Sequence, residues 1–205
     1  MPLRTTWMLV LLLAAGAAVA GGWVARDLAV PQAPQLSSGT WLPVPRSPGG
    51  FSLIDQSGAP FTQASLVGEP SLLFFGFTHC PDVCPTSLER FAQVSRMAGV
   101  PPLRVIFVTL DPARDTAAVL SRYVRAFDPH FMALTGSPQA VKHLAAQLDV
   151  AYERVELPGG DYTIDHTAVA FLLDASGQVV AIFTAPFDAA RLAQDLRRAA
   201  PFLHD

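Results

Sequence analysis

The chain contains only two cysteines, and they lie close together at Cys80 and Cys84. Both belong to the run FTHCPDVCP over residues 77–85. A disulfide between them would close a very short loop and remove little entropy from the unfolded chain, so a purely structural bridge is the weaker interpretation. Two thiols at this spacing more often serve disulfide exchange or bind a soft metal ion such as Cu(I).

A third donor would distinguish a metal site from a redox couple, and His166 is the histidine that we single out. It belongs to the segment 162–167, directly before a predicted strand at 168–173. One imidazole added to two thiolates makes a donor set that suits copper, since the nitrogen also accommodates Cu(II). The alternative is an ordinary surface histidine. We therefore predict Cys80, Cys84 and His166 as metal ligands, with the two cysteines also forming a redox pair.

The other histidines are weaker candidates. His79 adjoins Cys80, but strand geometry would turn its side chain away, so we predict an orienting role for it. We expect surface positions for His130, His143 and His204.

Several aspartates could place negative charge near this site. Asp82 lies between the cysteines and Asp165 precedes His166, while Asp111 and Asp115 follow another predicted strand. Each of the four could equally cap a helix or order a turn. Their roles therefore stay open.

The elements that must position these residues alternate between strand and helix. The apolar run 71–77 predicts a buried strand that leads into the cysteines, and helical spacing predicts a helix from Pro85 to Gly99. The start of that helix should favour thiolates. We predict further strands at 51–55, 105–110, 131–134, 168–173 and 179–184, further helices at 116–127, 137–148 and 188–199, and a hairpin tip at 155–162. The fold class is therefore α/β: a thioredoxin-like mixed sheet flanked by helices, over residues 51–205.

The beginning of the chain predicts export. Residues 5–25 carry no charged side chain and are long enough to cross a bilayer as one transmembrane helix, which needs about 20 residues. A cleaved signal peptide is the alternative, because small residues at 18–20 resemble a cleavage site. We favour the anchor, with residues 1–4 in the cytoplasm and a Pro-rich extended linker over 26–50. Export would place both cysteines in an oxidising compartment.

The composition argues against two other classes of protein. The formal net charge is -3, with 15% charged and 51% hydrophobic residues. Such a chain is too apolar for a disordered protein. It also shows no basic patch, so a nucleic-acid partner is not expected.

Taken together, the motifs resemble the Sco/SenC proteins, which are copper metallochaperones of cytochrome c oxidase assembly. The resemblance spans roughly residues 51–199 and rests on GFTHCPDVCP at 76–85, DPARDT at 111–116, LTG at 134–136 and DHT at 165–167. It implies that Cys80, Cys84 and His166 bind copper, as Cu(I) or Cu(II), and deliver it to the binuclear copper site of cytochrome c oxidase subunit II. Together with the anchor predicted at residues 5–25, the resemblance implies a single-pass protein of the bacterial inner membrane whose soluble domain lies in the periplasm. A periplasmic thiol reductant or copper donor would be a further partner.

A thiol-disulfide oxidoreductase that reduces the cysteines of that copper site is the second hypothesis, with either Cys80 or Cys84 attacking. Thioredoxins proper carry Cys-x2-Cys and a cis-proline opposite it. Here the spacer has three residues and no proline lies between Asp161 and Ala170, which argues against a general disulfide enzyme. A peroxidase of the peroxiredoxin type is less favoured, because a vicinal dithiol suits exchange or metal binding better. We therefore predict a binding and transfer protein rather than an enzyme.

Overall fold

The computed structural model describes residues 12–16, 21 and 33–204, and the chain divides into two units, Met1–Ala33 and Pro34–Asp205. In the first unit, residues 12–16 are helical. Most of the anchor predicted at 5–25 lies outside the described residues, as do the predicted cytoplasmic residues 1–4. Within the described part of the chain, no helix combines the length and the apolar character that crossing a bilayer requires.

An eight-stranded mixed sheet forms the centre of the second unit, in the order β1-β10-β9-β4-β5-β6-β2-β3. Its central strands run parallel and are β4 (Ser71–Gly76), β5 (Arg104–Thr109) and β6 (Met132–Thr135). All of β4 is buried, as its continuous apolar sequence predicts. The other strands are antiparallel to their neighbours and comprise β1 (Gly39–Arg46), β2 (Ser52–Asp55), β3 (Pro60–Thr62), β9 (Val169–Leu173) and β10 (Val179–Thr184).

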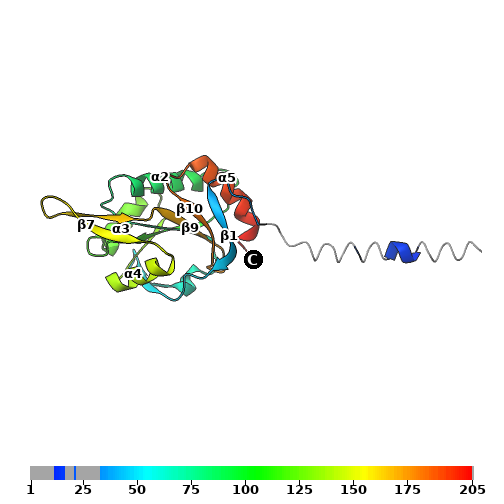
Figure 1. Cartoon of the computed structure of the whole chain (residues 1–205), viewed down its shortest axis with the longest axis horizontal. Helices are drawn as coiled ribbons and strands as arrows, with labels where there is room; N and C mark the ends of the chain where they lie inside the picture. Colours follow the sequence, from blue (N-terminus) through cyan, green and yellow to red (C-terminus); the bar gives the residue numbers. More distant parts are fainter. Residues whose placement is uncertain (1–11, 17–20, 22–32, 205) are drawn as a thin grey trace, which may run out of the picture. The chain divides into compact units, whose positions relative to one another are not determined.

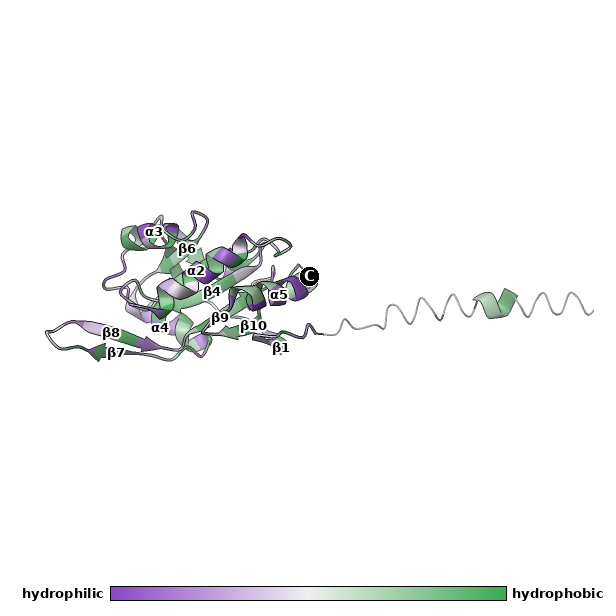
Figure 2. Ribbon diagram, turned by 90° about the horizontal axis from the view of Figure 1, so that it is seen from above, coloured by the Kyte–Doolittle hydropathy of each residue, from purple (hydrophilic) through white to green (hydrophobic). Residues whose placement is uncertain are grey.

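Helices cover both faces of this sheet. The helices α2 (Val83–Ser95) and α5 (Ala189–Ala199) pack together on one face, and α4 (Pro138–Gln147) lies on the opposite face (Figure 1). The helix α3 (Ala117–Arg125) connects β5 to β6, and two short 3-10 turns occupy Gln63–Leu66 and Ala200–Phe202. The strands of the main sheet are mostly hydrophobic, whereas the helices carry both hydrophobic and hydrophilic residues (Figure 2). The predicted mixed α/β class is confirmed.

The strand β1 corrects the linker prediction. Residues 39–46 pair antiparallel with β10 and form an edge of the sheet, so the prediction of an extended linker throughout 26–50 is wrong for them. Pro43 and Pro45 suggested a spacer because proline cannot continue a helix and suits an extended linker. An edge strand tolerates proline, since one side of its backbone has no neighbouring strand, and the pairing of β1 is irregular between Trp41 and Arg46.

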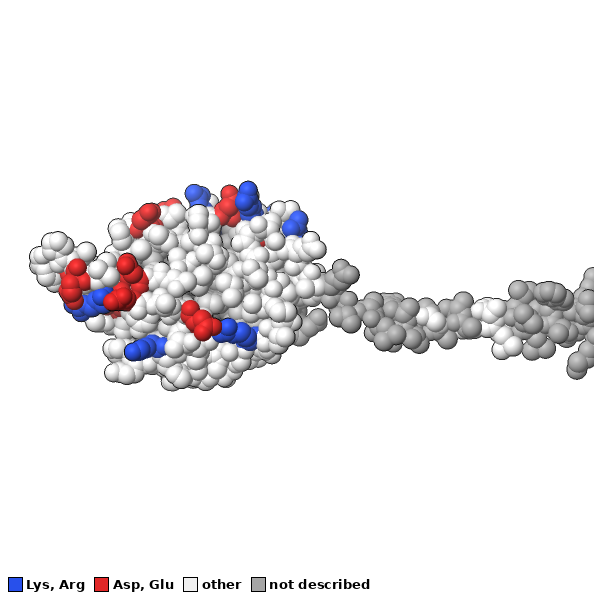
Figure 3. Space-filling model, in the orientation of Figure 1, with Lys and Arg blue, Asp and Glu red and all other residues white. Residues whose placement is uncertain are grey.

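A separate two-stranded sheet consists of β7 (Tyr152–Glu156) and β8 (Tyr162–His166). This hairpin projects from the main body of the domain (Figures 1 and 2). The predicted hairpin tip is confirmed, and Gly159 and Gly160 turn the chain there with φ of +93° and +87°. Acidic and basic side chains lie near one another around the hairpin on the face shown in Figure 3. His166 is the last residue of β8, so the hairpin brings its side chain back to the domain.

Candidate metal centre

The two cysteines lie where β4 passes into α2. Cys80 belongs to the connecting loop and Cys84 to the first turn of the helix, as predicted. Both are free thiols, and Cys80 is partly exposed whereas Cys84 is buried. The backbone N–H of Cys84 donates a hydrogen bond to Sγ of Cys80 over 3.4 Å. The unpaired N–H groups and the positive end of the helix dipole at this position favour negative charge on sulfur.

The sulfur of Cys84 occupies space that Gly76, the last residue of β4, leaves open. A Cβ atom at Gly76 would lie 2.7 Å from Sγ of Cys84 and 2.7 Å from the ring of Phe107. Both distances are well inside van der Waals contact, so a larger residue would displace one of these groups. The sequence motif contains Gly76, but its role follows only from this packing.

His166 faces the cysteines from the end of β8. Its Nε2 atom lies 3.7 Å from Sγ of Cys84. Its Nδ1 atom lies 3.1 Å from the carbonyl oxygen of Thr167, which can only accept, so Nδ1 donates this hydrogen bond. The bond directs Nε2 towards the cysteines, in the way that metal-binding histidines are usually oriented. The rings of Phe74 and Phe77 contact the imidazole edge to face, with centroids 6.4 Å and 6.2 Å away.

The fold therefore brings the three predicted donors together. Cys84 and His166 are 82 residues apart in the sequence yet in contact. Within the described residues, no group of three or more His, Cys, Asp and Glu side chains is already arranged to hold a metal ion. Ligation by Cys80, Cys84 and His166 stays a prediction.

The two thiols differ in their acid strength. A hydrogen bond from Cys84 lowers the pKa of Cys80 despite partial burial, and His166 adds to this effect. The same contact with Cys80, together with burial, raises the pKa of Cys84. Without metal, the pair therefore holds one proton on Cys84 and a negative charge on Cys80. The prediction that the helix start favours thiolates is wrong for Cys84, because a second buried charge beside the first is unfavourable.

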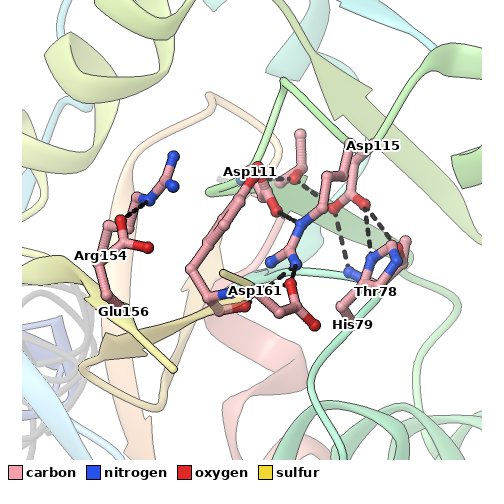
Figure 4. A network of polar contacts seen from close by, with 10 residues as sticks. Thr78, His79, Asp111, Asp115, Arg154, Glu156 and Asp161 are labelled. Atoms are coloured by element: carbon pink, nitrogen blue, oxygen red, sulfur yellow. Dashed lines mark hydrogen bonds and ion pairs between the residues drawn. The ribbon is translucent and has the colours of Figure 1, made fainter. Parts of the chain in front are cut away.

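Asp115 is fully buried, and its carboxylate lies next to Thr78 and His79 of the cysteine loop (Figure 4). Its carboxylate accepts hydrogen bonds from the N–H of Thr78 at 3.0 Å, the Thr78 hydroxyl at 2.5 Å and the Thr109 hydroxyl at 2.6 Å. His79 Nδ1 lies 4.0 Å from Asp115 and 3.1 Å from the Thr78 hydroxyl. The His79 side chain is thus directed at this polar group, and its orienting role stays a prediction.

The loop that carries Asp115 also contacts the hairpin, and Figure 4 shows Asp111 of this loop near Asp161 of the hairpin. Arg114 pairs with Asp111 and donates to Asp161 at 3.1 Å and to the carbonyl of Tyr162 at 3.0 Å. The Tyr162 hydroxyl donates to Asp111 at 2.9 Å. Arg114, Tyr162 and Thr78 were not predicted as site residues. Arg114 lies between two singled-out aspartates, but its partners on the hairpin are distant in the chain and have no sequence signal.

The remaining candidates are Asp82, beside the cysteines at the N-cap of α2, and three histidines on the surface. Asp82 accepts a hydrogen bond from the Thr86 hydroxyl at 3.3 Å, beside the start of α2. His130 contacts Asp128, His143 contacts Gln147, and His204 is exposed at the chain end, as predicted.

A cleft beside the donors gives access from solvent. Its volume is about 260 Å³, and Cys80 and His166 line it together with Asp82 and Asp165. A larger cavity of about 520 Å³ elsewhere, between α2 and the start of β5, contains none of the three predicted donors. The smaller cleft is therefore the relevant one for metal entry or for an approaching partner.

A mixed sheet with a dithiol at a strand-to-helix junction and a histidine facing it defines a thioredoxin-like dithiol protein. The SCO1/SenC family model matches residues 44–201, and the chain belongs to this family. A SCO2-like protein of Rickettsia felis is 40% identical over 139 residues, covering 66% of this chain and 68% of that protein. The SCO2 homolog of Bos taurus is 39% identical, and the match covers only 56% of its length.

Solved structures agree with this assignment. The structure of Arabidopsis thaliana ScoI with copper bound matches 75% of this chain and 98% of that one, with a TM-score of 0.71 and 33% identity. The structure of Bradyrhizobium japonicum ScoI with copper bound matches 73% of this chain and 97% of that one, with a TM-score of 0.66 and 41% identity. The thioredoxin-like domain predicted from sequence is thus the fold of this family.

Proposed function

We propose that this protein is a copper metallochaperone that binds copper through Cys80, Cys84 and His166 and delivers it to the binuclear copper site of cytochrome c oxidase subunit II. The observation that carries the proposal is the convergence of one imidazole nitrogen and two sulfurs, with Nε2 of His166 at 3.7 Å from Sγ of Cys84. The copper-bound state of the Arabidopsis and Bradyrhizobium relatives supports the same metal.

The donor set fits copper on chemical grounds. Two thiolates select a soft ion such as Cu(I), and one imidazole helps to accommodate Cu(II). Binding requires the Cys84 thiol to lose its proton, so metal binding releases protons. The hydrogen bond from Nδ1 of His166 to Thr167 holds the ring with Nε2 towards the sulfurs.

The different exposure of the two sulfurs suggests an order for transfer. Cys80 is partly exposed at the cleft, whereas Cys84 is buried. A partner thiolate can therefore replace the Cys80 sulfur first, with one copper–sulfur bond forming as another breaks. Replacement of Cys84 follows, and Cys84 takes up one proton released by the partner's thiols, while Cys80 stays a thiolate.

The compartment and the remaining partners belong to the same proposal. The uncharged stretch at 5–25 supports a single-pass anchor in a bacterial inner membrane with the domain in the periplasm. There, a periplasmic thiol reductant would keep Cys80 and Cys84 reduced, and a copper donor would load them. Retention of the full-length protein in washed membranes, with the domain degraded by protease added to spheroplasts, tests this placement.

Copper titration of the reduced full-length protein in detergent tests the central claim. We expect one copper ion per chain and, with Cu(II), a sulfur-to-copper charge-transfer absorption band. Oxidation of the cysteines to the disulfide should abolish both. Wild-type protein that binds no copper above the level of a Cys80→Ser/Cys84→Ser double variant would contradict the proposal.

A thiol-disulfide reductase is the second candidate, and one observation favours it: a partly exposed thiol, Cys80, lies beside a buried thiol, Cys84, whose N–H donates to the Cys80 sulfur. Cys80 would attack a partner disulfide, releasing one partner thiolate and forming a mixed disulfide. Cys84 would then attack Cys80, which releases the second thiolate and transfers two electrons in all. A Cys84→Ser variant should trap the mixed disulfide with an oxidised subunit II fragment, whereas a dithiol potential too oxidising to reduce that fragment would exclude the role.

A further inference from the structure

The buried carboxylate of Asp115 accepts hydrogen bonds from the cysteine loop. Asp115 is fully buried and accepts both the N–H and the hydroxyl of Thr78, which lies two residues before Cys80. Its third bond comes from Thr109 at the end of β5. The backbone of the loop is thereby tied to the central sheet at the point where it turns towards Cys80.

The strand β8, which carries His166, is bound by Arg114, the residue next to Asp115. The Arg114 guanidinium lies 3.6 Å from the centre of the Tyr162 ring and donates to the Tyr162 carbonyl. The Tyr162 hydroxyl donates to Asp111, and Asp111 pairs with Arg114. Tyr162 and His166 are the first and last residues of β8, and side chains alternate along a strand, so both project from the same face.

This attachment matters because β8 is not part of the main sheet. Its strand partner is β7, and a lone two-stranded hairpin is marginally stable by itself. The contacts of Arg114 and Asp111 with Tyr162 therefore contribute to where β8, and with it His166, lies relative to the cysteines. Neighbouring residues of one loop thus hold the two segments that carry the donors.

We infer that the loop Asp111–Asp115 sets the distance between the cysteines and His166, with Asp115 acting through Thr78 and Arg114 acting through Tyr162. These are positioning residues. The Arg114 side chain bonds to Asp111, Asp161 and Tyr162, and the Asp115 carboxylate bonds to Thr78 and Thr109, so both act through other residues. The inference rests on the proposed function, because its readout is copper binding. Loss of such supporting contacts typically weakens metal affinity by about 10–100-fold.

The hairpin supplies a matched pair of variants. Arg114 and Arg154 lie 3.6 Å and 3.7 Å from the centre of the same Tyr162 ring. Only Arg114 also bonds to the loop, whereas Arg154 pairs with the exposed Glu156. We expect Arg114→Ala to weaken Cu(II) binding by about 10-fold or more and to alter the Cu(II) absorption spectrum, and Arg154→Ala to change neither. Tyr162→Phe, which removes only the bond to Asp111, should give an intermediate loss if Arg114→Ala does not fold.

The same substitution in a protein that already carries His166→Ala separates a positioning role of Arg114 from a general loss of protein stability. If Arg114 acts by placing His166, Arg114→Ala should add no more than about a twofold loss of copper affinity once His166 is already alanine. If Arg114→Ala weakens copper affinity as much in the His166→Ala protein as it does in the wild type, Arg114 does not act by placing His166. Equal affinities of Arg114→Ala and Arg154→Ala would overturn it as well.

Substitutions of Thr78 test whether Asp115 positions the cysteine loop. Thr78→Val removes the hydroxyl that donates to Asp115, and Thr78→Ser keeps it. We expect a weaker copper complex for the valine variant and wild-type affinity for the serine variant. Equal binding by both would remove Asp115 from the inference. A wild-type protein that binds no copper would instead overturn the proposed function, so the two failures are distinguishable.

Discussion

Nε2 of His166 lies 3.7 Å from Sγ of Cys84, and the other ring nitrogen donates to the Thr167 carbonyl. The imidazole is therefore oriented towards the Cys84 thiol. A side chain whose orientation is already fixed loses less conformational entropy on binding than one that rotates freely. This relationship makes His166 the first residue to test.

Replacing His166 with alanine should remove one of three ligands. We expect Cu(II) affinity to fall by more than the roughly 10–100-fold that supporting residues contribute, because a ligand is lost directly. The Cys80–Cys84 pair should still cycle between dithiol and disulfide. His143→Ala is the matched control, since His143 is on the surface of α4 and contacts Gln147. Unchanged copper titration of the reduced His166→Ala protein would remove this residue from the site.

Alkylation should distinguish the two cysteines. In the reduced, folded, metal-free protein, we expect iodoacetamide to modify the partly exposed Cys80 and to leave the buried Cys84 unmodified. Intact mass spectrometry should thus find one adduct without denaturant and two with it. Cys84→Ser should still give one adduct. Rapid labelling of a folded Cys80→Ser variant would contradict the burial of Cys84.

Adding a methyl group at Gly76 should displace the Cys84 sulfur. The new Cβ would lie 2.7 Å from Sγ, so Gly76→Ala should lower the free energy of unfolding by about 1–3 kcal/mol and weaken copper binding. Gly50→Ala is a suitable control, because a Cβ there meets nothing within 4 Å. Thermal melts and copper titrations of both variants measure the two effects. Wild-type behaviour of Gly76→Ala would mean that the sulfur has room to move.

Acid should weaken the hydrogen bonds that attach Ser37 and Ser38, just before β1, to Asp195 of α5. Asp195 is fully buried; burial raises its pKa, but hydrogen bonds from the N–H and hydroxyl groups of Ser37 and Ser38, at 2.7–2.9 Å, outweigh this and lower it. A carboxyl group with a lowered folded-state pKa stabilises the fold above its unfolded pKa of about 3.9, and this contribution is lost as the pH falls through the folded value.

Asp195→Asn should therefore destabilise the protein at pH 7 by about 1–3 kcal/mol, since hydrogen bonds to a charged acceptor are lost. The difference from wild type should shrink below about pH 4. Urea unfolding at several pH values measures it, and Ser38→Ala should reproduce part of the effect. A difference that is constant with pH would show that the Asp195 charge does not act in this way.

Most of the main elements could be predicted because their signals are local. The apolar run at 71–77, the helical spacing after Pro85 and the cap at Ser137 each correspond to an observed element. The strand β1 was missed because Pro43 and Pro45 are typical of a linker. The strand forms through pairing with β10, which is distant in the sequence. Edge strands are defined by a distant neighbour more than by their own residues.

By itself, the sequence determined the types of donor and the strand-to-helix junction at which both cysteines lie, because residue chemistry and helix start signals are local properties. Only the tertiary structure decided which thiol is exposed, which carries the proton and what holds His166 opposite them. Burial and charge pairing arise from segments that are far apart in the chain. The link from Arg114 to Tyr162, and the space that Gly76 leaves for the Cys84 sulfur, exist only once the strands and the hairpin have packed.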